Sequence, residues 1–158
     1  MQWGISKTIV VEVSASQRFP GRYESLTKIA EFIRCACAQA GFDSCTTYSV
    51  ETAVDEACSN IIEHAYGGED IGEICCTCHL EEDRLVIILQ DNGKPFKPEK
   101  FRIPKDTIPL KKYKRKKKQG LGLYFIYKIM DEVSFATSPS EGNTLTLVKY
   151  KSSPPPQA

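Results

Sequence analysis

Apolar residues recur along the chain with two different periods, and the longer period predicts two helices. From Tyr23 to Ala40 and from about Thr47 to Tyr66 they return every three or four residues, which places them on one face of an α-helix. Gly41 is expected to end the first helix and Gly67-Gly68 the second, because glycine adopts the left-handed C-terminal conformation without strain. The second helix has the longer unbroken apolar series, which consists of Val50, Ala53, Val54, Ala57, Cys58, Ile61, Ile62 and Ala65.

Runs of β-branched and apolar residues predict the strands, which lie at about residues 7–13, 71–80, 84–90, 133–136 and 144–150. Three acidic residues separate the second run from the third. This gap is short enough for a hairpin, so the two strands should be antiparallel. A further helix is expected from Gly120 to Met130. The order of these elements predicts an α+β sandwich, whose antiparallel-dominated mixed sheet carries its helices on one face.

The length and composition indicate a single globular domain. A chain of 158 residues can bury a sizeable core, and 41% hydrophobic with 26% charged residues is ordinary for a soluble protein. Residues 1–151 are expected to form the domain and the proline-rich residues 152–158 a flexible tail. Neither a signal peptide nor an apolar run of the ~18–20 residues that span a membrane is found, so a cytoplasmic location is expected. Seven cysteines, an odd number, favour reduced thiols.

Positive charge is concentrated in one segment. Seven of the 21 Lys and Arg residues lie between Lys111 and Lys118, which leaves 14 basic against 20 acidic residues elsewhere. This basic run lies within residues 91–119, which lack periodicity, and a loop of this length is usually functional or disordered. The run could bind phosphate groups or an acidic partner, or it could simply be solvated. Direct nucleic-acid binding is disfavoured, because only Tyr113 offers an aromatic ring there and the rest of the domain is acidic.

Two polar side chains stand at the edge of the apolar face of the second helix. Glu56 and Asn60 are one turn apart, so their side chains lie on the same face. A carboxylate can accept a proton from a hydroxyl group, and an amide oxygen can coordinate magnesium. One helical turn is a suitable separation for a base and a metal ligand around a phosphate. Taken alone, such a pair is more often simply solvated.

Three glycine-containing turns carry further candidate chemistry. Asp91 follows a predicted strand directly and could accept a hydrogen bond from an exocyclic amine such as that of adenine, while Gly93 would let the backbone approach a ring. The stretch Gly120-Leu121-Gly122 opens a helix, where free N–H groups and the positive end of the helix dipole favour phosphate. The stretch Glu141-Gly142-Asn143-Thr144 leads into the last strand. Each of these is, by itself, also consistent with an ordinary turn.

Taken in order, the four features resemble the N, G1, G2 and G3 boxes of the GHKL ATPase superfamily, and the similarity extends from about Thr8 to Tyr150. The boxes are Glu56-x3-Asn60, Asp91-x-Gly93, Gly120-x-Gly122 and Gly142-x-Thr144. The sequence around these boxes is even more similar to that of the anti-sigma-factor serine kinases of the RsbW and SpoIIAB type. The similar segments are EACSNIIEHAY, DNGKPF, GLGLYFIYKIMDEV and GNTLTLVKY.

The resemblance implies a Bergerat-type fold with ATP and Mg²⁺ bound between the helices and a lid at about residues 94–119. It implies that Glu56 is the general base and that Asn60 holds magnesium. The remaining implied nucleotide contacts are Asp91 and Gly93 at the adenine, Gly120, Leu121 and Gly122 at the phosphates, and Thr144 on the base side.

The same resemblance implies a serine/threonine-protein kinase that binds a sigma factor and phosphorylates an anti-sigma antagonist of the STAS type. A homodimer is possible. One alternative is a non-catalytic ATP-binding module in which Glu56 is vestigial; another is a kinase-like switch that acts on a non-sigma signalling partner. The presence of Glu56 favours catalysis, because a module that only binds ATP has no chemical use for a base.

Two other groups of side chains are less informative. His64 lies two turns after Glu56 and could reach the lid or bound phosphates, or could merely cap the end of the helix. Cys75, Cys76, Cys78 and His79 are close in sequence. They alternate between the two faces of a predicted strand and match no zinc-ligand spacing, so ordinary core and surface thiols are expected.

Overall fold

The two predicted helical patterns form α1 (Ser25–Ala40) and α2 (Ser44–Asn60) in the computed structural model, which describes residues 13–97 and 121–151. Gly41 ends α1 in the left-handed conformation, with φ of 79°, as the sequence predicted. Helix α2 begins slightly before the predicted Thr47, because Asp43 caps it. The Asp43 carboxylate accepts a hydrogen bond of 2.7 Å from the backbone N–H of Thr46.

The second helical pattern changes geometry directly after Asn60. Residues Ile61–Tyr66 form a π-helical segment, η1, which Gly67 ends with φ of 76°. Hydrogen bonds of a π-helix span five residues, so the segment is wider than an α-helix, and such segments occur frequently at functional sites. The apolar period alone did not distinguish this segment from the regular helix before it.

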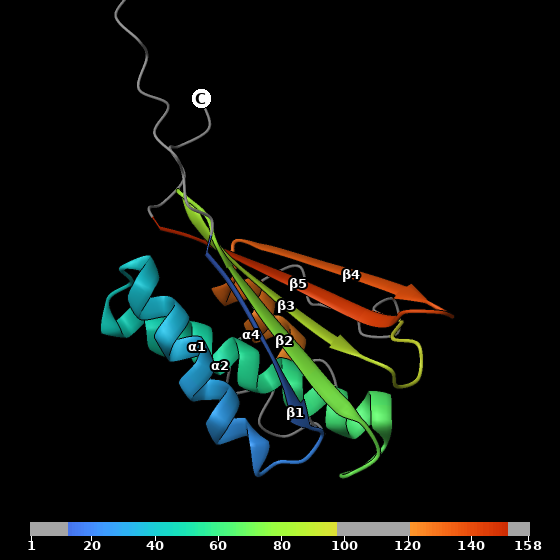
Figure 1. Cartoon of the computed structure of the whole chain (residues 1–158). Helices are drawn as coiled ribbons and strands as arrows, with labels where there is room; N and C mark the ends of the chain where they lie inside the picture. Colours follow the sequence, from blue (N-terminus) through green and yellow to red (C-terminus); the bar gives the residue numbers. More distant parts are fainter. Residues whose placement is uncertain (1–12, 98–120, 152–158) are drawn as a thin grey trace, which may run out of the picture.

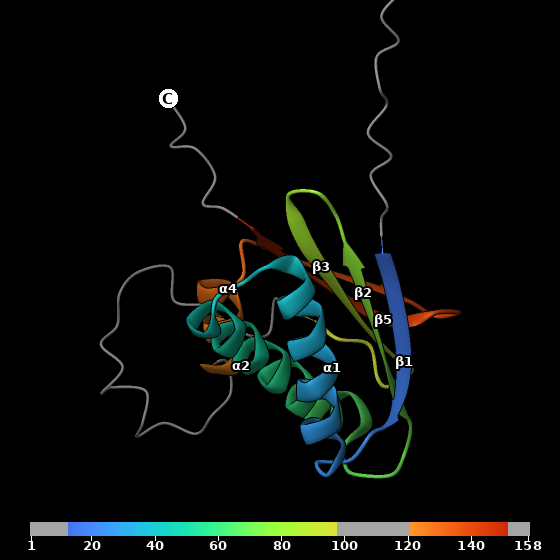
Figure 2. The same ribbon diagram turned by 60° about the vertical axis from the view of Figure 1, so that its left-hand side comes forward.

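Five strands of the described residues form one sheet in the order β1-β2-β3-β5-β4. They are β1 (Val13–Pro20), β2 (Glu73–Leu80), β3 (Arg84–Asp91), β4 (Glu132–Ser138) and β5 (Gly142–Tyr150). Each neighbouring pair is antiparallel, including the predicted hairpin of β2 and β3. Helices α1, α2 and α4 (Leu121–Ile129) lie on one face of this sheet (Figures 1 and 2). The predicted α+β sandwich is therefore confirmed.

The edge strand β1 covers residues that were not predicted to form a strand, apart from Val13. Of the expected strand at residues 7–13, only Val13 lies among the described residues. The strand continues instead to Pro20, and within it only Phe19 is buried. Its sequence VSASQRFP has little apolar alternation, so the strand depends on an eight-residue antiparallel register with β2 rather than on its own pattern.

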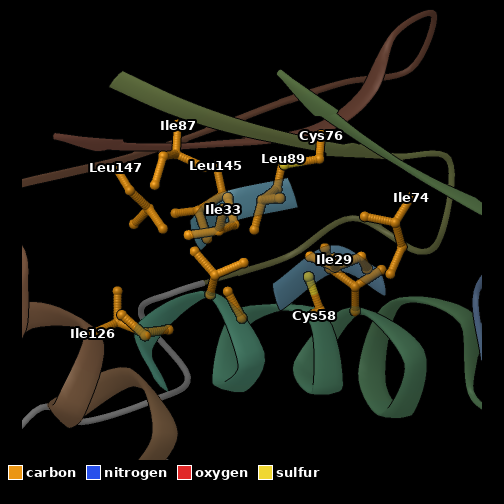
Figure 3. Close-up of a cluster of buried hydrophobic side chains, with 14 of the residues drawn as sticks. Ile29, Ile33, Cys58, Ile74, Cys76, Ile87, Leu89, Ile126, Leu145 and Leu147 are labelled. Atoms are coloured by element: carbon orange, nitrogen blue, oxygen red, sulfur yellow. The ribbon is translucent and has the colours of Figure 1, made fainter. Parts of the chain in front are cut away.

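The core lies between the helices and the inner face of the sheet. Figure 3 shows side chains from β2, β3 and β5 facing those of α1, α2 and α4, and the labelled residues include Ile74, Leu89, Leu147, Ile33, Cys58 and Ile126. Each fully buried Ile or Leu side chain stabilises the fold by roughly 1.5–3 kcal/mol. This packing holds α2 and α4 in a set position over the sheet. None of the helices in the described ranges is long and apolar enough to cross a membrane.

Candidate functional site

A cavity of about 440 Å³ opens between the helices and the ends of the central strands. Most of its wall is apolar, with Ala57 and Ile61 on one side and Leu123 and Ile126 of α4 on another. The polar side chains at the wall are Asn60, Asp91, Lys97, Thr137, Asn143 and Thr144. Cavities of a few hundred Å³ with apolar walls and a few convergent polar groups are typical of sites for small organic ligands. Three of the residues selected from the sequence, Asn60, Asp91 and Thr144, thus line one cavity.

The buried carboxylate of Asp91 lies at the end of β3, with 5% of the residue exposed. Its Oδ1 atom accepts hydrogen bonds of 2.9 Å from the backbone N–H of Gly93 and from Nδ2 of Asn143. Burial raises the pKa of the Asp91 carboxyl, and the two hydrogen bonds partly oppose that rise. Among the described residues no hydrogen bond reaches Oδ2. The second oxygen can therefore accept a hydrogen bond from a ligand.

Packing within the protein requires glycine at position 93, independently of any ligand. A Cβ atom at this position would lie 2.5 Å from the carbonyl carbon and oxygen of Ala65. The next residue, Lys94, donates its backbone N–H to the same Ala65 oxygen at 2.7 Å. The turn after β3 therefore packs against η1 through backbone contacts, and a side chain at position 93 would push the turn away from η1. The sequence predicts only the approach of a ligand ring at Gly93, and the packing against Ala65 becomes visible in the fold.

The start of α4 lies directly over Glu56 and Asn60 of α2. A Cβ atom on Gly122 would be 2.8 Å from Oε2 of Glu56 and 3.4 Å from Nδ2 of Asn60. Since Asn60 also lines the cavity, this places the first turn of α4 at the cavity edge. Unsatisfied N–H groups at a helix start favour an anion. Leu121 begins the helix, whereas Gly120 and residues 98–119 of the expected lid lie outside the described residues, as does the basic run.

The sequence interpretation missed Asn143, the polar group with the most hydrogen bonds in the site. It selected the neighbouring Thr144, which does line the cavity. Asn143 is only 6% exposed and donates hydrogen bonds to Oδ1 of Asp91 and to the backbone oxygen of Lys94. In the sequence it follows Gly142, which has φ of 75°, so it was indistinguishable from an ordinary turn asparagine.

An aromatic pair that the sequence interpretation also missed forms part of the wall. The rings of Phe96 and Phe135 are stacked, with centroids 4.8 Å apart and planes inclined by 27°. Both residues line the cavity, one from the segment after β3 and the other from β4. A flat aromatic surface beside a buried carboxylate suits a planar ring that carries an amine.

The other side chains noted in the sequence lie apart from this arrangement. His64 is in the last turn of η1, with Nε2 3.8 Å from the Glu63 carboxylate, and is not among the described residues that line the cavity. Cys76 and Cys78 are buried, whereas Cys75 between Ile74 and Cys76 is not, in agreement with the predicted alternation. Within the described ranges no three His, Cys, Asp or Glu side chains are grouped so that they could hold a metal ion.

The chain is similar to known proteins over most of its length. Residues 19–149 match the histidine kinase-like ATPase domain family. The serine-protein kinase RsbW of Bacillus cereus is 33% identical over 134 residues, covering 84% of this chain and 82% of the relative. The serine-protein kinase RsbW of Bacillus mycoides is 32% identical over 142 residues, with the same two coverages of 84% and 82%. The matched region includes the whole cavity described above.

Proposed function

Because the chain belongs to the histidine kinase-like ATPase family, and within it to the branch of RsbW-type serine-protein kinases, we propose that it is an ATP-dependent serine/threonine-protein kinase of the anti-sigma-factor type. In this proposal it binds a sigma factor in the cytoplasm and phosphorylates a STAS-type antagonist. The observation that carries the proposal is the contact of Gly122 with Glu56 and Asn60, at the edge of a cavity that also contains Asp91.

At the base end of the cavity, Asp91 is proposed to receive the exocyclic amine of adenine. Its Oδ1 is already occupied by two donors, so Oδ2 is the acceptor available to the ligand. The stacked rings of Phe96 and Phe135 would bound the adenine, and Thr144 would contact it from β5. Gly93 keeps the turn after β3 close to η1, which holds the Asp91 carboxylate at the wall.

At the phosphate end, the backbone N–H groups of Gly120, Leu121 and Gly122 are proposed to bind the phosphate oxygens of ATP. Asn60 suits magnesium, since its amide oxygen is a hard ligand close to the start of α4. Magnesium usually keeps several waters and takes few protein ligands, most often one or two carboxylates, together with substrate phosphates. In this site the Asn60 amide oxygen would be such a protein ligand. The bound ion would neutralise charge on the phosphates.

Glu56 is proposed to act on the partner's hydroxyl group. Its carboxylate would take the proton from a serine or threonine as that oxygen forms a bond to the γ-phosphorus, and the bond to the β–γ bridging oxygen would break to release ADP. The remaining contribution of the chain is to position ATP, since phosphoryl transfer is mostly positioning and charge stabilisation.

The proposal is tested by incubating the purified chain with γ-labelled ATP, a STAS protein and a sigma factor from the same genome. The expected result is label on one serine or threonine of the STAS protein, abolished when that residue is alanine, together with co-purification of the sigma factor. ATP binding without any label transfer would identify a non-catalytic module. Label transfer without sigma-factor binding would identify a switch that acts on another partner. Light scattering on the purified chain alone would measure whether it is a homodimer.

Replacing Gly122 by alanine is expected to lower phosphoryl transfer by about tenfold or more, because small displacements of a catalytic group are costly. The new methyl group would lie 2.8 Å from Oε2 of Glu56, the end of a flexible side chain, so the carboxylate should move while the fold persists. Thermal unfolding should therefore show no loss of stability, since alanine also favours a helix. In the background of Glu56→Gln, Gly122→Ala should have no further effect on the rate; a further tenfold loss would mean that it acts elsewhere.

A further inference from the structure

The side-chain amide of Asn143 uses all of its hydrogen-bonding capacity within the described residues. Its Nδ2 donates to Oδ1 of Asp91 at 2.9 Å and to the backbone oxygen of Lys94 at 2.8 Å. Its Oδ1 accepts from the backbone N–H of Phe96 and from the Thr137 hydroxyl, both at 3.0 Å. Two donated and two accepted bonds saturate a primary amide of this geometry. Asn143 therefore joins β5 to the ends of β3 and β4 and to the segment that follows β3.

The partners of Asn143 define one orientation of its amide. The ionised Asp91 carboxylate and the Lys94 carbonyl can only accept, and the Phe96 N–H can only donate. A rotation of the amide by 180° would therefore set acceptors against acceptors and a donor against donors. Since the residue is 6% exposed, solvent cannot replace the lost bonds readily. The position of the Asp91 carboxylate and the path of the chain at residues 94–96 are thus determined together.

We propose that Asn143 is a positioning residue that couples recognition of the adenine base by Asp91 to residues 94–96, which follow β3. This inference rests on the proposed function, since it assumes that adenine occupies the cavity. Asn143 would hold Oδ1 of Asp91, so that only Oδ2 faces the ligand, and would hold Phe96 in its stack on Phe135. Binding of the base would then be transmitted to Phe96 through a single buried amide.

Discrimination between bases follows from this arrangement. An ionised Asp91 with one oxygen already saturated offers a ligand an acceptor and no donor. Adenine presents an amine to such a group, whereas guanine presents a carbonyl oxygen at the equivalent ring position. If Asn143 no longer held Asp91, the carboxylate could rotate or take up a proton. The preference for ATP over GTP should then decrease along with the affinity for ATP.

The variant Asn143→Asp tests this coupling, because it keeps the size of the side chain and its Oδ1 acceptor but removes both N–H donors. At about pH 8 both carboxyls should be ionised and should repel one another, so ATP should bind about tenfold or more weakly than to wild type. Two neighbouring carboxyls share a proton as the pH falls, which raises one of their apparent pKa values. At about pH 6 the shared proton can restore a donor to Asp91, and the ratio of variant to wild-type affinity should rise.

The measurement is calorimetric titration of wild type and variant with Mg-ATP and Mg-GTP at both pH values. Other charged or titratable groups near the pair are Tyr66 on η1, Lys97 at the cavity wall, and three residues that line a second hollow with Asp91. These three are Arg18, Glu73 and Glu141, and all five groups are present in both proteins, so the ratio compares the two proteins in the same surroundings. Thr137→Val is the matched control, since it removes only the hydroxyl that donates to Asn143 and should leave the ratio independent of pH. A variant weakened by the same factor at both pH values, with unchanged preference for ATP, would overturn the proposal.

A measurement on wild type keeps the proposal testable if Asn143→Asp does not fold. Titration of isotope-labelled protein with adenosine should shift the side-chain amide resonance of Asn143 and the backbone amide of Phe96 with one common Kd. Guanosine should shift neither. Shifts at Asp91 without any change at Asn143 or Phe96 would overturn the coupling but leave the proposed function standing. If wild type bound neither ATP nor adenosine, both the coupling and the proposed function would fail.

Discussion

Replacement of Glu56 by glutamine is expected to lower phosphoryl transfer by about 10²–10⁴-fold, to a small residual rate, while ATP binding is retained. General-base catalysis typically contributes about 10²–10⁴-fold, and glutamine has the same shape but cannot take the proton from a hydroxyl group. Glu56 is not among the described residues that line the cavity, so its loss should leave nucleotide affinity within about twofold of wild type. The rate of label transfer to the STAS protein and the Kd for Mg-ATP are measured on the same preparation.

A matched control for this variant is Glu51→Gln, which makes the same chemical change on the same helix. Glu51 faces α1, where its Oε1 lies 2.7 Å from Nε of Arg34, and it takes no part in the contact with Gly122. Its replacement should leave transfer unchanged and lower stability only slightly, by about 1 kcal/mol, because the Arg34 side chain is 58% exposed although that of Glu51 is only 16% exposed. Equal transfer by Glu56→Gln and wild type would remove Glu56 as the base.

Replacement of Asp91 by asparagine is expected to weaken ATP binding by about 1.5–3 kcal/mol, which is about 10–150-fold in Kd. The variant exchanges a charge-assisted acceptor for a neutral amide. Its side-chain oxygen can still accept from the N–H of Gly93 and from Nδ2 of Asn143, but its NH₂ group then takes the place of Oδ2 and faces the adenine amine, donor against donor. Calorimetric titration with ATP and with adenosine should show similar losses for both ligands, because the change affects the base end. Unchanged affinity would contradict the adenine assignment.

The pH dependence of ATP binding gives a second test of Asp91. Burial raises the pKa of this carboxyl, so protonation should begin at a higher pH than for an ordinary aspartate. ATP affinity should therefore fall as the pH falls through this raised pKa, and Asp91→Asn should lack that dependence. Stability of the free protein should change in the opposite direction. The folded state binds this proton more readily than the unfolded state, so its stability rises as the pH falls through the same range.

Local patterns were sufficient for the helices and for the spacing of the first two candidate residues. An apolar period of three to four residues identifies a buried helix face wherever that helix packs, so α1 was predicted nearly to its ends, and α2 and η1 together were predicted as one helix. The same period placed Glu56 and Asn60 at the edge of that face. Strand β1 was missed for the converse reason, because an exposed edge strand has no buried face to give it a pattern.

The candidate site was predicted only as far as its members carry recognisable chemistry in sequence. Asp91, Gly93 and Gly122 were selected as single positions, but their neighbours were not. The contact of Gly93 with Ala65 and that of Gly122 with Glu56 join segments with no local relation. Phe96 and Phe135 could not be paired from sequence, because the stack depends on β4 lying at the sheet edge next to β5.

By itself, the sequence determined which residues can supply a base, a metal ligand, an acceptor for an amine and a flexible helix start, because these are properties of single side chains at local spacings. Tertiary structure decided which of them meet. The packing of α2 and α4 on the sheet sets Gly122 over Glu56 and Asn60. The pairing of β3 with β5 brings Asn143 to Asp91, and burial there raises the pKa of its carboxyl. Distances and burial arise only when distant segments pack, so no local pattern contains them.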